Sequence, residues 1–147
     1  MKFNCSVEIN QPQQKVAELF ANPAYLGEYQ DSFISKELLQ GEEGQNGAIS
    51  KMLYKQGKGQ MELTETILEN DLPHSFVGHY HHKHMDNTMR CEFTPLSESS
   101  TRYVSEIEYT AFRGFMPKLI AKLFPGMFKK QVQKWLDNFK VFAENQS

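Results

Sequence analysis

The sequence predicts an α+β fold in which a curled, seven-stranded antiparallel sheet wraps around one long C-terminal helix, with two short helices after the first strand. Three observations predict it. Residues 3–9 alternate between apolar and polar side chains, which is the period of a half-buried strand. Clusters of turn-forming residues then recur between residues 43 and 100, as in a series of hairpins. In the last third of the chain, apolar residues recur every three or four positions, as in a helix.

Composition agrees with one folded domain. The chain has 147 residues, of which 39% are hydrophobic and 12% aromatic, which is enough apolar material for one core and excludes disorder. Its two cysteines have no Cys-x-x-Cys spacing and predict neither a disulfide framework nor a zinc pair. The first residues lack the apolar stretch of a secretory signal. We therefore expect a single cytoplasmic domain spanning residues 1–147.

The elements follow in order. After the strand at 3–9, Pro12 suits the first turn of a helix, and the Asn22-Pro23 step ends that helix because a residue before proline avoids the α region. A second short helical turn is expected from Pro23 to Tyr29. The first strand should pair with the seventh, because the hairpin series otherwise leaves two open sheet edges. The six further strands are expected near residues 32–41, 47–55, 60–69, 75–84, 88–95 and 101–111.

The C-terminal helix is expected from Pro117 to Phe142, with a kink or break at Pro125-Gly126. Residues 113–147 hold seven Lys/Arg and only two Asp/Glu, although the whole chain carries a net charge of −2. We interpret these lysines as a solvated helix face, since the apolar face is needed by the core. This interpretation predicts no stable membrane insertion, and the absence of a globally basic surface predicts no nucleic-acid partner.

A curled sheet that holds one helix seldom fills its interior, so a pocket is expected between them. Its predicted inward-facing polar groups are Glu65 on one strand, Tyr80 and His82 on the next, and Tyr109 on the last strand. The predicted ligand-binding residues are Tyr29, Phe33, Tyr54, Met61, Leu63, Glu65, Tyr80, His82, Phe93, Tyr109, Met116, Ile120 and Phe124.

Four histidines between residues 79 and 84 raise the question of a metal site. Residues i and i+2 share a face of a strand, so His79/His81 and His82/His84 are each possible ligand pairs. No third or fourth ligand has a suitable spacing, and we favour a solvated histidine face with no metal. No dinucleotide fingerprint, phosphate-binding glycine loop or nucleophile elbow is present, so no cofactor is expected.

Glu65 and His82 are the candidates for chemistry. A carboxyl group beside an imidazole in an apolar pocket could transfer a proton during a reaction. The simpler interpretation is that both side chains orient the polar end of a bound molecule, since such groups also occur in plain binding pockets.

Several segments resemble one known superfamily. These are residues 7–16 (VEINQPQQKV) followed by 21–26 (ANPAYL), the hairpin strand at 92–96 (EFTPL), and residues 135–140 (WLDNFK) in the last helix. They resemble the START-like (SRPBCC) superfamily, in particular its small polyketide cyclase/dehydrase-like and lipid-transport-like members. Tyr29 stands where that family often has Trp, and Ser99-Ser100 replaces a Gly-rich turn. The resemblance implies a helix-grip fold with a pocket, and no particular reaction.

Three functions follow as hypotheses. The first is the binding of a small hydrophobic or amphipathic molecule, lipid- or polyketide-like, between the sheet and the helix. The alternative is a polyketide cyclase or dehydratase that uses Glu65 and His82 as acid and base. The third is a module that binds a protein partner through an exposed apolar groove. The sequence leaves ligand identity and oligomeric state open.

Overall fold

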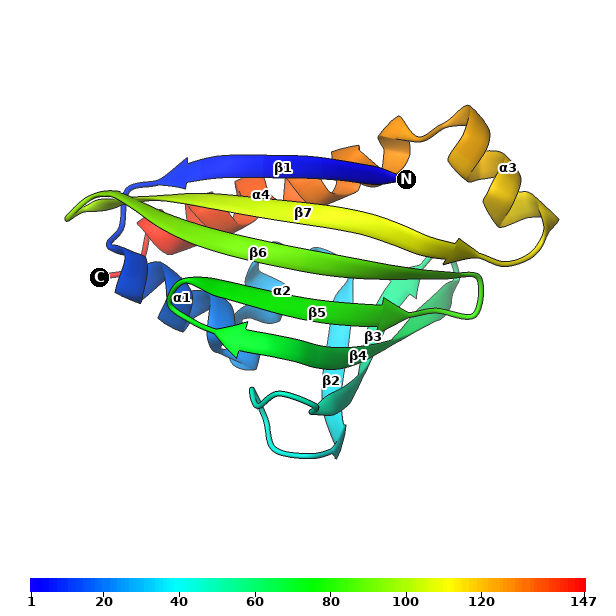
Figure 1. Ribbon diagram of the computed structural model, residues 1–147, viewed down its shortest axis with the longest axis horizontal. Helices are drawn as coiled ribbons and strands as arrows, with labels where there is room; N and C mark the ends of the chain where they lie inside the picture. The colour runs from blue at the N-terminus through cyan, green and yellow to red at the C-terminus, as the bar shows by residue number, and fades with distance from the viewer.

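All seven strands join one antiparallel sheet with the order β1-β7-β6-β5-β4-β3-β2 in the computed structural model, which describes residues 1–147 (Figure 1). The strands are β1 Lys2–Ile9, β2 Phe33–Gln40, β3 Ile49–Gln56, β4 Gly59–Asp71, β5 Ser75–His81, β6 Met85–Ser97 and β7 Ser100–Phe112. The helices are α1 Gln13–Ala21, the short 3-10 turn η1 Pro23–Tyr25, α2 Leu26–Tyr29, α3 Phe115–Leu123 and α4 Gly126–Glu144.

The predicted pairing of the first and last strands is confirmed. β1 runs antiparallel to β7, with Cys5 opposite Ser105 in the register. Every other neighbouring pair in the sheet is a hairpin of consecutive strands. The β1–β7 pairing covers the β7 edge but does not close the sheet, so β1 and β2 are its two edges. The expected α+β helix-grip architecture is therefore present.

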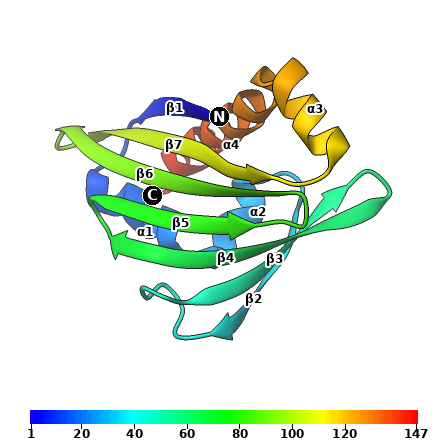
Figure 2. The ribbon, with the colours of Figure 1, turned by 45° about the vertical axis from the view of Figure 1, so that its right-hand side comes forward.

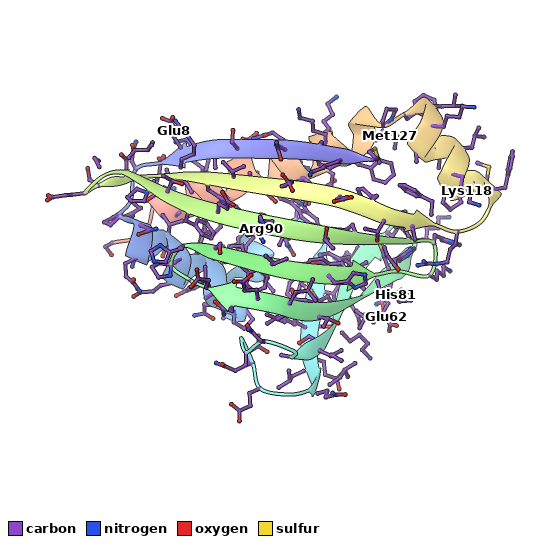
Figure 3. The ribbon with its side chains drawn as sticks, in the orientation of Figure 1. Glu8, Glu62, His81, Arg90, Lys118 and Met127 are labelled. Atoms are coloured by element: carbon purple, nitrogen blue, oxygen red, sulfur yellow. The ribbon has the colours of Figure 1, made fainter.

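The sheet curves around α4, and α1 and α2 close one end of the curve (Figure 2). The densest packing lies at this end, where Phe139 of α4 meets Tyr29 of α2 and Tyr103 of β7 edge to face. Ile9 and Val16 are fully buried beside them. The outer face of the sheet is polar, with Glu62 and Arg90 exposed on it (Figure 3). The core thus fills only one end of the space between the sheet and α4.

The predicted interruption at Pro125 is confirmed, and it is a full break. α3 ends at Leu123, and α4 begins at Gly126 with Pro125 as its N-cap. α3 points away from the sheet, whereas α4 crosses the concave face (Figures 1 and 2). No residue of α3 is buried. None of the helices is both long enough and apolar enough to span a bilayer.

Trp135 lies at the edge of the inner face of α4. Its indole is only half-buried: it stacks on Tyr54 with ring centroids 5.7 Å apart, and its Nε1–H donates to Asp31 Oδ1 at 3.2 Å. The polar Nε1 atom draws the indole toward the surface. The buried positions of this helix are occupied by Leu136, Phe139 and Ala143.

Candidate functional site: a cavity between the sheet and α4

A cavity of about 530 Å³ lies between the concave face of the sheet and α4. Of its 35 lining residues, 23 are hydrophobic, so the cavity favours an apolar occupant. Period-two alternation on β4 and β5 turns Met61, Leu63 and Glu65 of β4, and Tyr80 of β5, toward the cavity. Their neighbours along the strands face the outer surface.

Eight of the thirteen predicted ligand-binding residues line this cavity. They come from α2 and from strands β3, β4, β5 and β7, or, for His82, from the turn after β5. They are Tyr29, Tyr54, Met61, Leu63, Glu65, Tyr80, His82 and Tyr109. Their contact with a ligand remains a prediction.

The other five lie outside the lining. Phe93 packs into the closed end of the core against Phe20 and Tyr103. Phe33 contacts Tyr54 edge to face from the neighbouring strand. Met116, Ile120 and Phe124 were expected to cover the cavity from the helix, and this expectation is wrong because the break at Pro125 carries α3 away from the sheet.

α4 supplies the helical wall instead. Phe128, Val132, Leu136 and Phe139 share one helix face at helical spacing and line the cavity, with Met127, Gln131 and Trp135 beside them. The sequence showed this period, but its apolar stripe was assigned to solid core. Five methionines also line the cavity: Met52, Met61, Met85, Met89 and Met127.

A row of polar side chains crosses the apolar wall. Glu65 of β4 is the register partner of Tyr80 of β5, Tyr80 is that of Asn87 of β6, and Asn87 is that of Tyr109 of β7. All four residues line the cavity. Asn87 was not among the predicted site residues, although alternation along β6 from the predicted Phe93 through positions 91 and 89 leads to it.

Glu65 is the charged centre of this row and is only 6% exposed. Its Oε2 accepts a hydrogen bond of 2.8 Å from the Tyr80 hydroxyl, and its Oε1 lies 3.2 Å from the Lys36 ammonium. Lys36 is also paired with Glu43 at 2.8 Å. One ammonium group therefore stands between two carboxylates, and the cluster carries one net negative charge.

The protonation of this cluster follows from its surroundings. Burial alone would lower the pKa of Lys36, but the Glu65 and Glu43 carboxylates outweigh burial and raise this pKa. Burial, followed by the charge of Glu65, raises the pKa of Tyr80 well above its ordinary value. Lys36 thus stays charged, and the Tyr80 hydroxyl stays a hydrogen-bond donor.

The Tyr80 ring reaches Glu65 by lying over Gly78, two residues back on the same face of β5. A Cβ atom at position 78 would come within 2.9 Å of the Tyr80 hydroxyl oxygen. Glycine inside a strand often marks such a close approach. Gly78 therefore leaves the space that the Tyr80–Glu65 hydrogen bond needs.

His82 lines the cavity near the β5–β6 turn and is 8% exposed. Its Nδ1 accepts a hydrogen bond of 3.1 Å from the backbone N–H of His84. Burial, with smaller contributions from nearby positive groups including His84, lowers the pKa of His82. Glu65 and His82 share no hydrogen bond, because each side chain is held by other partners.

The four histidines do not gather around one point. His81 pairs with Asp86 at 2.7 Å on the outer side, whereas His82 faces the cavity. The structure contains no group of three or more His, Cys, Asp or Glu side chains with the geometry to hold a metal ion.

Comparison with known proteins defines the family. Residues 1–144 match the family described as "Polyketide cyclase / dehydrase and lipid transport". The chain belongs to this family. Among curated proteins, no significant sequence match is found.

Several solved structures share the fold at low sequence identity. The Zhui aromatase/cyclase from Streptomyces sp. R1128 is 13% identical, with a TM-score of 0.80 over 98% of this chain and 93% of that chain. The protein TTHA0849 from Thermus thermophilus is 16% identical, with a TM-score of 0.78 over 97% of both chains. A START superfamily protein from Mycobacterium smegmatis is 10% identical, with a TM-score of 0.76 over 96% of this chain and 97% of that one. These likenesses establish the START-like fold.

Proposed function

We propose that this family member binds a small, mainly apolar molecule whose polar end donates a hydrogen bond to Glu65. The proposal rests on the row of polar side chains, with Glu65 as its one charged member, that crosses the wall of a mainly apolar cavity of about 530 Å³. That volume is typical of small-molecule sites. Removal of apolar ligand surface from water would drive binding, at about 25 cal/mol per Å².

The charge of the cluster of Lys36, Glu65 and Glu43 determines which polar group a ligand can place beside Glu65. The Lys36 ammonium is already shared by Glu65 and Glu43, at 3.2 and 2.8 Å. A ligand carboxylate would place a third negative group beside one positive group, whereas a hydroxyl can donate to a free lone pair of Glu65. Alcohols and phenols should therefore bind more tightly than fatty acids of the same length.

The test is displacement of the neutral fluorescent probe N-phenyl-1-naphthylamine. The probe should bind at one saturable site, and decanol should displace it at lower concentration than decanoate at neutral pH. Replacing Leu63 by Trp fills the cavity from β4 and should abolish probe binding. Ile120→Trp is the matched control, because α3 contributes no residue to the lining. Equal binding to the wild type and Leu63→Trp would contradict the proposal.

A cyclase or dehydratase activity is the second candidate, because Glu65 and His82 both line the cavity. Proton transfer between them would require a substrate or water to join them, since each is held by another partner. Incubation with a β-hydroxyacyl thioester, monitored by mass for loss of water, tests this candidate. We expect no turnover, and dehydration that disappears in Glu65→Gln would favour the enzyme.

A further inference from the structure

α3 presents an apolar surface that the fold does not use. Phe115, Met116, Leu123 and Phe124, together with Met127 at the start of α4, are each between 56% and 76% exposed. Five of the twelve exposed large hydrophobic residues of the chain thus fall within thirteen consecutive positions. Scattered apolar residues on a surface are ordinary, but a contiguous group marks an interaction site. We call residues 113–130 the α3 surface.

The α3 surface is strongly basic. It contains Arg113, Lys118, Lys122, Lys129 and Lys130 and no acidic residue. Arg113 is paired with Asp86, and none of the four lysines lies within 4 Å of a carboxylate. The sequence predicts these lysines on the solvated back of a core helix. The structure does not support that prediction for α3, because none of its residues is fully buried and Phe115, Met116 and Leu123 are more than half exposed.

Both ends of the α3 surface are anchored. At its start, Arg113 donates to Asp86 Oδ1 at 2.7 Å and to the backbone carbonyls of His82 and Lys83. At its end, the Phe128 ring packs edge to face against Tyr109 at 4.9 Å. The helix between these anchors stands clear of the sheet, with Lys118 on it and Met127 just after it (Figure 3).

The α3 surface also adjoins the cavity. Met127 lines the cavity and is 59% exposed, so the cavity wall continues to the outside at this point. Phe128, the next residue, lines the cavity as well. An apolar molecule leaving past Met127 would meet the apolar side chains of α3 directly.

We propose that the α3 surface docks the protein on an anionic lipid bilayer. Apolar side chains rimmed by lysines are typical of helices that lie in the membrane interface, and each cation near such a surface contributes about 1 kcal/mol. Charge decides against the other occupant, a second copy of this chain, because two surfaces that carry only positive groups repel each other. The docked helix lies in the interface and does not cross the bilayer.

Co-sedimentation with vesicles tests the proposal. The full chain should bind vesicles of mixed phosphatidylglycerol and phosphatidylcholine and should bind pure phosphatidylcholine weakly. Lys118→Glu with Lys122→Glu should lower the partition coefficient by about 30-fold or more, since two favourable cations are lost. Phe115→Ser with Phe124→Ser should lower it by about 10-fold or more, since two apolar anchors are lost.

Two control variants match these changes elsewhere on the surface. Arg90→Glu with Arg102→Glu reverses two exposed charges on the sheet, and Leu39→Ser with Leu68→Ser removes two exposed apolar side chains of β2 and β4. Both should bind the anionic vesicles like the wild type, and all variants should keep the probe binding of the cavity.

Failure of the wild type to bind anionic vesicles would overturn the proposal and leave the cavity function standing. Equal loss in the controls would overturn it too, because binding would then not depend on α3. A wild-type dimer that the Phe115→Ser/Phe124→Ser variant dissociates, without a change in vesicle binding, would assign the α3 surface to self-association instead.

Discussion

Glu65 shows how a charged side chain is kept on an apolar wall. Each of its carboxylate oxygens has its own partner, Tyr80 at 2.8 Å or Lys36 at 3.2 Å. A buried charge that loses its partner is costly, whereas replacing the whole pair by apolar groups can be nearly neutral. The cluster therefore contributes more to the charge and polarity of the cavity wall than to the free energy of unfolding.

A double-mutant cycle tests this account of the pair. Lys36→Met leaves the buried Glu65 carboxylate without its cation and should lower the free energy of unfolding by about 3 kcal/mol. Adding Glu65→Leu removes the stranded carboxylate, so the double variant should be about 2 kcal/mol more stable than the sum of the single changes predicts. Urea unfolding measures the free energy of unfolding of the wild type, the two single variants and the double variant. Additive changes would mean that the two side chains do not interact.

Gly78 is the second residue on which the polar row depends. Gly78→Ala places a methyl group against the Tyr80 ring and should lower the free energy of unfolding by about 1–3 kcal/mol through overpacking. Gly59→Ala is the matched control, since a Cβ there meets its nearest atom at an ordinary 3.8 Å. Equal effects of the two changes would show that Tyr80 does not lie over Gly78.

Protonation of His82 makes the free energy of unfolding depend on pH in mildly acidic solution. Its pKa in the folded state is lowered from 6.5 by burial and by nearby positive groups, so below about pH 6.5 the unfolded chain binds the proton first. The free energy of unfolding should therefore fall as the pH is lowered below this value. His82→Asn should remove this part of the slope, which is at most about 1.4 kcal/mol per pH unit.

Urea unfolding of both proteins at pH 7.5 and 5.5 measures the difference. The carboxyl groups whose pKa is lowered, those of Asp31, Asp86 and Glu144, start from ordinary values of 3.8 to 4.5, and their stabilisation is lost only below this range. An equal fall in the free energy of unfolding between pH 7.5 and 5.5 in the wild type and in His82→Asn would contradict the assignment of this pH dependence to His82.

At the scale of elements, the strands followed from the sequence because alternation directly reports which side chains face inward. This period placed Glu65, Tyr80 and His82 on the inner face. It could not show that Glu65 lies opposite Tyr80, because the register also depends on the irregularity between Ile67 and Glu69. The hydrogen bond to Tyr80 and the pairing with Lys36 therefore required the structure.

For the helices too, the sequence predicts the local structure, and their packing requires the structure. Proline at position 125 predicted an interruption, since it cannot donate the backbone hydrogen bond of a continuous helix. The direction of the segment before it depends on tertiary contacts that a local pattern does not contain. α3 could therefore be expected as a helix, but its separation from the sheet could not.

Two neighbouring residues of α4 test its orientation. Leu136 is 4% exposed, and Leu136→Ala should lower the free energy of unfolding by about 2–5 kcal/mol. Trp135 is half-buried, so Trp135→Ala should cost about 2 kcal/mol, less than a fully buried tryptophan would. Thermal or urea unfolding compares the two. A larger loss for Trp135 would mean that α4 is rotated from the position described.

At the scale of the whole molecule, the core and the cavity share part of one wall. Leu136 and Phe139 belong to the core and also line the cavity, whereas Met61 and Leu63 line the cavity without belonging to the core. Substitutions of Met61 or Leu63 can therefore alter binding without removing a core side chain. Substitutions of Leu136 or Phe139 change the free energy of unfolding as well.

The seven methionines allow the position of a bound ligand to be measured directly. In protein labelled with ¹³C at the methionine methyl groups, bound decanol should give intermolecular NOEs to Met52, Met61, Met85 and Met89, which line the cavity. Met1 and Met116 lie outside the lining and serve as internal controls in the same spectrum. NOEs to the four cavity methyls and none to the controls are the predicted result. NOEs to Met116 alone, or to no methionine of the cavity at saturating decanol, would contradict a ligand site between the sheet and α4.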